Sequence, residues 1–302
     1  MVWGASRWMK LAVVLAQVVA LTVMTATVVG VTASSAALRK GATIYYLDVG
    51  ASVSVGVQPT PQAPKGQPTN EGYGNKLVTL EVAKGVSIHL TKIGCPGEST
   101  FTLISGNNPC YRSVDNQLSD AEAYLRAHHL RDVLVTIDLG FNNVVQCMRF
   151  STIDQTCVNH RFTQLQRQLP MILKSLTQAA GPNVTLIGVG HYDPFLASAI
   201  HSAKYARFAQ ASVAVIARLN TVIQKDYRSF AIPMADVAGA FKTNNTSPVN
   251  YSKLGAIATN VAQICSWTWM CAPSPYGPNL HPNDSGYMAI ARAILAVMPT
   301  TI

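Results

Sequence analysis

Short apolar segments alternate with amphipathic segments along most of the chain, and this alternation constrains the possible folds more than any other feature. Strands are predicted at the apolar runs 43–49, 86–93, 132–139, 184–189 and 229–237. Helices are predicted at 77–83, 118–128, 162–179, 203–227 and 285–297. Such alternation is typical of a mostly parallel sheet with right-handed crossovers and helices on both faces. We therefore expect an α/β protein with three layers and about five strands.

Polar groups follow three of the predicted strands, at the end of a parallel sheet where functional sites lie. Gly50–Gly56 follows the first strand, Gly94–Thr100 the second and Asp138–Asn143 the third. A fourth group, Gly277–Asn283, precedes the last predicted helix. These four groups contain the candidate functional residues.

The four groups resemble the four sequence blocks of the SGNH (GDSL-type) hydrolases, in the same order. The blocks are a Ser in a Gly-x-Ser turn, a Gly, an Asn in Gly-x-Asn and a His-Pro near the end. The resemblance extends from about Tyr45 to Ala296, and the flanking segments are similar to a secreted, disulfide-containing actinobacterial branch. It implies a flavodoxin-like α/β/α fold and a serine ester hydrolase, similar to carboxylesterases and lipases, that requires no metal or organic cofactor.

The resemblance also implies a role for each matching residue. Ser52 would be the nucleophile and His281 the base, and the oxyanion hole would consist of the Ser52 and Gly97 N–H groups and the Asn142 side chain. These residue types suit the chemistry, because a serine hydroxyl needs an imidazole to remove its proton. Backbone and amide N–H groups can stabilise the oxyanion of an acyl-enzyme reaction.

Two positions depart from the family pattern. Ala51 stands where the family has Asp before the serine, and Pro278 stands where an acid is expected three residues before the histidine. That acid orients the imidazole, and we favour the Pro278 backbone carbonyl as its replacement. A relocated acid, Asp193 or Asp284, is the second possibility. The alternatives in function are a polysaccharide acetyl esterase, and a catalytically inactive SGNH-fold protein that binds an envelope glycan or lipid.

The N-terminal 36 residues predict export. Arg7 and Lys10 precede an uncharged run from Leu11 to Val31, and small residues follow it, which is the order of a secretory signal peptide. A run of about 20 apolar residues can also span a bilayer, so a retained membrane anchor stays open. Either option places the hydrolase domain, residues 37–302, outside the cell or at the extracellular face of the membrane.

The cysteine spacing agrees with export. The chain has six cysteines, which allow 15 pairings in principle. They form three local couples, and we favour the disulfides Cys95–Cys110, Cys147–Cys157 and Cys265–Cys271. No couple has the C-x-x-C spacing of a zinc or redox site, so no metal is expected.

The formal net charge of +9 does not identify a nucleic-acid-binding protein, because the basic residues are scattered and no nucleic-acid-binding motif accompanies them. We expect a monomer whose partner is a small-molecule, lipid or glycan ester substrate.

Overall fold

The central element of the fold is a five-stranded parallel sheet. The structure, a computed structural model, describes residues 43–299 except 112–114, 150 and 253, so the predicted export segment 1–36 lies outside the described residues. The strands lie in the order β2-β1-β3-β6-β7, with the bounds β1 (Thr43–Gly50), β2 (Ser87–Lys92), β3 (Asp132–Asp138), β6 (Val184–Val189) and β7 (Met234–Ala235). Counted along the sheet strands alone, this is the flavodoxin-like order 2-1-3-4-5. The predicted fold class is confirmed.

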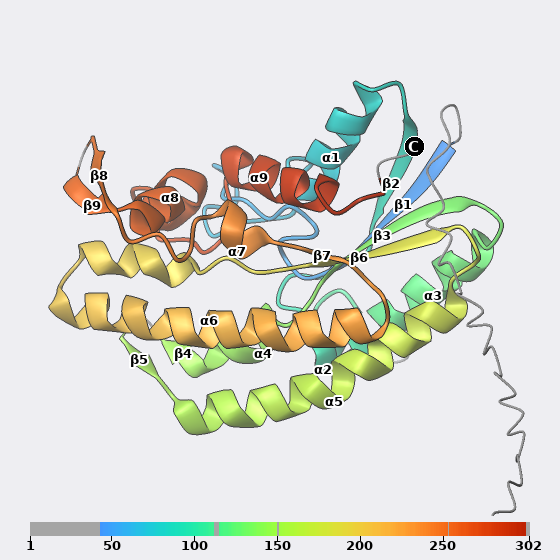
Figure 1. The fold of residues 1–302 in the computed structure, drawn as a ribbon, viewed down its shortest axis with the longest axis horizontal. Helices are drawn as coiled ribbons and strands as arrows, with labels where there is room; N and C mark the ends of the chain where they lie inside the picture. Colours follow the sequence, from blue (N-terminus) through green and yellow to red (C-terminus); the bar gives the residue numbers. More distant parts are fainter. Residues whose placement is uncertain (1–42, 112–114, 150, 253, 300–302) are drawn as a thin grey trace, which may run out of the picture. The chain divides into compact units, whose positions relative to one another are not determined.

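Helices cover both faces of this sheet (Figure 1). One face carries α1 and α9, and the other carries α3, α5 and α6; their bounds are α1 (Tyr73–Val82), α9 (Asp284–Leu295), α3 (Gln117–Ala127), α5 (Gln155–Ala179) and α6 (Ala203–Ser229). Along β1, Leu47 and Val49 pack with the α3–α5–α6 side, while Ile44 and Tyr46 pack with the α1–α9 side. Successive side chains of a strand point to opposite faces, so β1 contributes to both cores.

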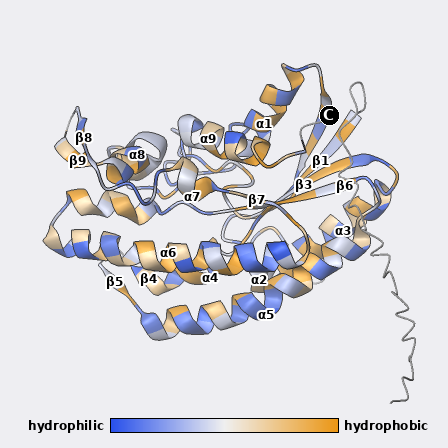
Figure 2. Cartoon of the chain, in the orientation of Figure 1, coloured by the Kyte–Doolittle hydropathy of each residue, from blue (hydrophilic) through white to orange (hydrophobic). Residues whose placement is uncertain are grey.

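The long helices α5 and α6 are amphipathic. Figure 2 shows both as alternating apolar and polar stretches, as expected for helices with one face against the sheet. Helix α5 begins seven residues before the predicted start at Phe162, because the Asp154 side chain accepts a hydrogen bond from the Cys157 N–H and caps the helix.

The last strand of the sheet is shorter than predicted. Instead of spanning 229–237, β7 contains only Met234 and Ala235. Helix α6 continues through Ser229, Ala231 has a φ of 55°, and Pro233 has no N–H to donate. The backbone therefore becomes extended only after Pro233.

Several short elements were not predicted from the sequence. Among them, α2 follows β2 and α4 follows β3, and a small hairpin lies apart from the main sheet; the set is α2 (Thr100–Ser105), α4 (Phe141–Val144), η1 (Val145–Cys147), β4 (Met148–Arg149), β5 (Thr152–Ile153), η2 (Pro194–Ile200), α7 (Val237–Ala240), β8 (Pro248–Tyr251), β9 (Gly255–Ala258), α8 (Thr259–Trp267) and η3 (Trp269–Cys271). Most have four residues or fewer, too few to produce a periodic apolar pattern.

Three disulfides link the six cysteines in the couples favoured from the sequence. They are Cys95–Cys110, Cys147–Cys157 and Cys265–Cys271, with sequence separations of 15, 10 and 6 residues. Within the described part of the chain, no helix combines the length and apolar character needed to cross a membrane.

Candidate active site

The candidate residues lie where the sheet connections change direction. The chain leaves β1 toward β2 and leaves β3 toward β6, so the segments after β1 and β3 diverge at the carboxyl end of the sheet. Gly50 of β1 and Asp138 of β3 are the last paired residues of these strands. Ser52 and Asn142 follow them, on either side of the crevice that such a divergence creates.

A cavity of about 310 Å³ occupies this position. Ser52, Gly97, Asn142 and His281 all line it. The structure therefore brings together the four residues that the sequence pattern singled out, although Ser52 and His281 lie near opposite ends of the described chain. The volume is at the small end of the range of roughly 300–1,000 Å³ for small-molecule sites.

Three hydrogen-bond donors on the cavity wall have no acceptor. Among the described residues, neither the N–H groups of Ser52 and Gly97 nor the side-chain amide of Asn142 makes a hydrogen bond. Gly97 has a φ of 85°, and no atom lies within 4 Å of the position that a Cβ would occupy. Polar groups with no partner in a concave site are well suited to bind a ligand.

The side-chain amide of the next residue, Asn143, is already used in hydrogen bonds within the protein. The Asn143 side chain is buried, its Oδ1 accepts from the Thr100 N–H at 3.1 Å, and its Nδ2 donates to the Thr100 Oγ1 at 2.7 Å. Asn143 thus connects the start of α2 to α4, which leaves Asn142 as the amide available to the cavity.

The turn that carries Ser52 is fixed by its neighbours. The Ser54 hydroxyl donates to the Ala51 carbonyl at 2.7 Å, and the Val57 N–H donates to the Ser52 carbonyl at 2.9 Å. Burial raises the pKa of the Asp138 carboxyl, while His191 and the backbone N–H groups of Ser54 and Ala51 oppose this rise. The turn is thus held without using the Ser52 hydroxyl, which has no hydrogen-bond partner among the described residues.

The orientation of His281 corrects one prediction from the sequence. The Nδ1 of His281 lies 2.7 Å from the Oδ1 of Asn279, so the Pro278 backbone carbonyl is not the partner that the structure gives the ring. The same Oδ1 accepts from the His281 N–H at 3.0 Å, and the Asn279 Nδ2 donates to the Lys65 carbonyl at 2.9 Å. The side chain of Asn279 therefore reaches the bonding position of Nδ1.

These contacts fix both the amide and the imidazole. Because the Nδ2 of Asn279 is committed to the Lys65 carbonyl, its Oδ1 faces the ring and can only accept. Nδ1 must then carry the proton, and Nε2 is left with a lone pair. This is the tautomer that a general base needs.

Neither relocated acid orients His281. The Asp193 carboxylate accepts from the Ser212 hydroxyl at 2.7 Å and the Phe195 N–H at 3.0 Å, and burial raises its pKa to about 7. Asp284 accepts from the Gln58 side chain at 3.0 Å. Within the described residues, no carboxylate makes a hydrogen bond to the ring of His281.

Burial lowers the pKa of His281 to about 4, so the ring is neutral at neutral pH. The described residues include no hydrogen bond between the Ser52 hydroxyl and the His281 Nε2, although both groups line the cavity. Such bonds are often long in enzymes without substrate and shorten in the complex. A hydroxyl, a neutral imidazole and three unpartnered donors around one cavity can perform acyl transfer.

Sequence reasoning missed several residues of the cavity. Asn279 was not predicted because the family pattern has an acid three residues before the histidine, whereas an amide two residues before it is the partner. His191 also lines the cavity, with Nε2 2.9 Å from the Leu139 carbonyl and Nδ1 3.6 Å from the Asp138 Oδ1. The Tyr192 hydroxyl donates to the Leu280 carbonyl at 2.6 Å and so fixes the residue before His281. Among the described residues, no group of three or more His, Cys, Asp or Glu side chains is arranged to hold a metal.

Several solved structures are similar to this chain. A phospholipase A1 from Streptomyces albidoflavus is 16% identical over 85% of this chain and 100% of its own, with a TM-score of 0.53. An extracellular lipase from Streptomyces rimosus is 17% identical over 84% of this chain and 100% of its own, with a TM-score of 0.49. A member of the lipolytic G-D-S-L family from Veillonella parvula is 13% identical over 84% of this chain and 98% of its own, with a TM-score of 0.46.

The likeness to the Streptomyces phospholipase A1 shows a shared fold, and it agrees with the α/β/α fold that the resemblance to the SGNH hydrolases implies. No family model matches the sequence, and no curated protein matches it.

Proposed function

We propose that the chain is an exported serine ester hydrolase in which Ser52 is the nucleophile and His281 the general base. One observation carries the proposal: the Ser52 hydroxyl, the His281 ring and three donors that have no partner among the described residues line a single cavity. The apolar part of the wall, including Val53, Phe141 and Leu280, would hold the acyl or alcohol portion of an ester.

The reaction would proceed through an acyl-enzyme. The Ser52 Oγ attacks the ester carbonyl carbon while the His281 Nε2 takes its proton, and the N–H groups of Ser52 and Gly97 and the Asn142 amide stabilise the oxyanion. The tetrahedral intermediate then breaks its bond to the alcohol, which receives the proton from His281. A water molecule attacks the acyl-enzyme by the same route and releases the acid and free Ser52.

In this proposal Asn279 takes the place of the missing acid. Its amide oxygen orients the imidazole, but it supplies no negative charge to stabilise the imidazolium that forms during the reaction. The base should therefore be correctly oriented and weakly basic.

We expect the acidic limb of the kcat/KM pH profile to lie at an unusually low pH. Burial lowers the pKa of His281 to about 4, so the catalytically competent neutral ring is present above this pH and is lost as the pH falls through it. kcat/KM should change little between about pH 5 and 8, because it reports the protonation of the free enzyme. A limb near the ordinary histidine pKa would contradict this buried, uncharged setting for the base.

Replacing the orienting amide by a carboxylate should move that limb upward. In Asn279→Asp, a negative charge beside Nδ1 would stabilise the imidazolium and raise the pKa of His281, shifting the acidic limb by about 1–3 pH units. Asn159→Asp on α5, where the side chain contacts Arg218 instead, is the matched control and should leave the profile unchanged. An unshifted limb in Asn279→Asp would exclude Asn279 as the orienting residue.

Export rests on two features. The segment 1–36 has the order of a signal peptide or anchor, and three disulfides are typical of proteins in oxidising compartments. We propose that residues 37–302 act outside the cytoplasm as a monomer.

The proposal is tested by measuring turnover of p-nitrophenyl esters of increasing acyl length, together with labelling by a fluorophosphonate. Turnover and a single label on the peptide containing Ser52, found by mass spectrometry, are expected. A well-folded protein that hydrolyses no ester and takes up no label would refute the enzyme and favour a binding protein.

A further inference from the structure

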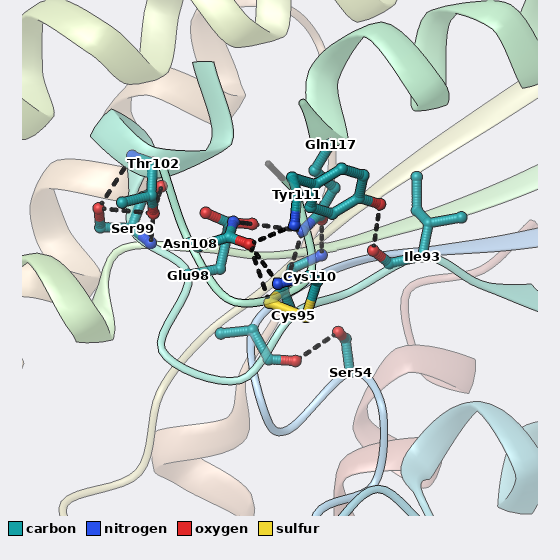
Figure 3. The surroundings of a disulfide bond; sticks show 12 residues. Ser54, Ile93, Cys95, Glu98, Ser99, Thr102, Asn108, Cys110, Tyr111 and Gln117 are labelled. Carbon is teal, nitrogen blue, oxygen red and sulfur yellow. Dashed lines mark hydrogen bonds between the residues drawn. A yellow bond between two sulfur atoms is a disulfide. The ribbon is translucent and has the colours of Figure 1, made fainter. Parts of the chain in front are cut away.

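A fully buried carboxylate lies directly after the candidate oxyanion glycine. Glu98 has no exposed surface, and its Oε2 accepts from the Asn108 Nδ2 at 2.7 Å and the Gln117 Nε2 at 2.8 Å. Figure 3 shows these three side chains gathered beside the Cys95–Cys110 disulfide. A buried carboxylate is costly unless it is well bonded, so its position next to Gly97 calls for a reason.

Gln117, the first residue of α3, connects this carboxylate to the turn that carries the nucleophile. Its Oε1 accepts from the Gly50 N–H at 2.7 Å, and its Nε2 donates to the Gly50 carbonyl at 3.0 Å as well as to Glu98. Gly50 lies two residues before Ser52, and a Cβ there would collide with the carbonyl oxygen of Asp138. One side chain therefore holds both backbone groups of the residue that begins the Ser52 turn.

The other side of Glu98 is fixed by the disulfide loop. The Glu98 N–H donates to the Cys95 carbonyl at 3.0 Å, and the Cys95 N–H donates to the Gly50 carbonyl at 3.0 Å. Asn108 is held inside the loop closed by Cys95 and Cys110, since its Oδ1 accepts from the Cys110 N–H at 2.9 Å. The segment that carries Gly97 is thus bound at both ends to a rigid frame.

We propose that Glu98 and Gln117 are positioning residues that hold the Gly97 N–H and the Ser52 N–H at the spacing an oxyanion requires. Neither side chain needs to touch the substrate. The inference rests on the proposed function, because it assigns both N–H groups to the oxyanion hole. Catalytic donors must be held within about 0.5 Å of the productive geometry. Among the described residues, Gln117 is the only side chain that hydrogen-bonds both to Gly50, which begins the Ser52 turn, and to Glu98, which follows Gly97.

A substitution at Glu98 should therefore reduce kcat more than it changes KM. In Glu98→Gln the oxygen that accepts from Asn108 and Gln117 loses its negative charge, so both hydrogen bonds weaken and the frame loosens. We expect kcat to fall by about 10- to 100-fold, less than for direct loss of an oxyanion donor, with KM within about threefold. Phosphonylation of Ser52 should slow by a similar factor, because it uses the same donors.

The matched control is Glu81→Gln on α1. Glu81 is fully buried, as Glu98 is, and among the described residues one carboxylate oxygen of each, Oε2 of Glu81 and Oε1 of Glu98, has no hydrogen-bond partner. The bonded partner of Glu81 is Lys84, and Glu81 does not line the cavity. This variant should lower the unfolding midpoint without lowering kcat. A kcat for Glu98→Gln within threefold of wild type, or an equal loss of kcat in Glu81→Gln, would overturn the inference.

Asn108→Ala keeps the inference testable if Glu98→Gln fails to fold. It removes a single donor to Glu98 from a partly exposed position and should lower kcat by about 3- to 10-fold at unchanged KM; an unchanged kcat would overturn the inference. Wild-type turnover separates the two proposals. A wild type without turnover refutes the hydrolase itself, whereas normal turnover in these variants refutes only the positioning role.

Discussion

Replacing Ser52 by alanine is expected to lower kcat for ester hydrolysis by about 10⁴-fold or more. The Ser52 Oγ is the only protein atom in the proposed mechanism that forms a covalent bond to the substrate, so its loss removes the acyl-enzyme route entirely. The donors of the cavity would remain and could still favour attack by water, which accounts for a small residual rate. Steady-state kinetics and fluorophosphonate labelling measure the two effects, and the label should be absent.

Ser54→Ala is the companion variant for this measurement. Ser54 belongs to the same turn, but its hydroxyl is buried and bonded to the Ala51 carbonyl. Its loss should cost about 1 kcal/mol of stability and leave Ser52 open to labelling. If Ser52→Ala retained the label or lost less than tenfold in rate while Ser54→Ala lost the label, the nucleophile would have to be reassigned.

The fold was predictable because its strands and long helices repeat one physical pattern. Apolar runs such as 132–139 can only be buried between helical layers, and alternation with amphipathic segments implies a parallel sheet. Boundaries set by single contacts were less predictable. The early start of α5 depends on the Asp154 cap, and the short β7 depends on the backbone around Ala231 and Pro233.

Some residues of the candidate site were likewise predictable from the sequence, and others were not. Ser52, Gly97 and Asn142 come from sequence blocks that follow strands, and His281 comes from the block before the last helix. The structure brings all four to one cavity. Asn279 was not predicted, since an amide that replaces a carboxylate at a different spacing has no motif. Gln117 bonds to the Gly50 backbone and to the Glu98 carboxylate, contacts between segments far apart in the sequence, so only the three-dimensional arrangement identifies these two residues.

In the proposed mechanism, the uncharged Asn279 partner of His281 makes stabilisation of the oxyanion more important. Without a carboxylate at Nδ1, the charge that develops on the imidazole is stabilised less than in a triad with an acid. Stabilising the opposite charge, on the substrate oxygen, is then the larger contribution available to the site. The donors of the cavity should therefore be especially sensitive to substitution.

Asn142→Ala is accordingly expected to lower kcat by about 10²–10³-fold, with little change in KM or in the unfolding midpoint. The Asn142 amide has no hydrogen-bond partner among the described residues, so the folded protein without substrate loses no bond when it is removed. The donor would be used only when an oxyanion forms, which confines the loss to the transition state. Steady-state kinetics and thermal unfolding of the same preparations measure these effects.

The same substitution at the adjacent residue, Asn143→Ala, is expected to have the opposite effect: a large loss of stability and a smaller loss of kcat. Asn143→Ala breaks two hydrogen bonds to Thr100 and leaves a buried N–H without an acceptor, which should cost about 1–3 kcal/mol of stability. Its kcat should fall less than that of Asn142→Ala, because Asn143 reaches the cavity only through the packing of α2 and α4. Were Asn143→Ala the slower enzyme and Asn142→Ala the less stable protein, the two amides would have exchanged roles, and the oxyanion hole would need a different third donor.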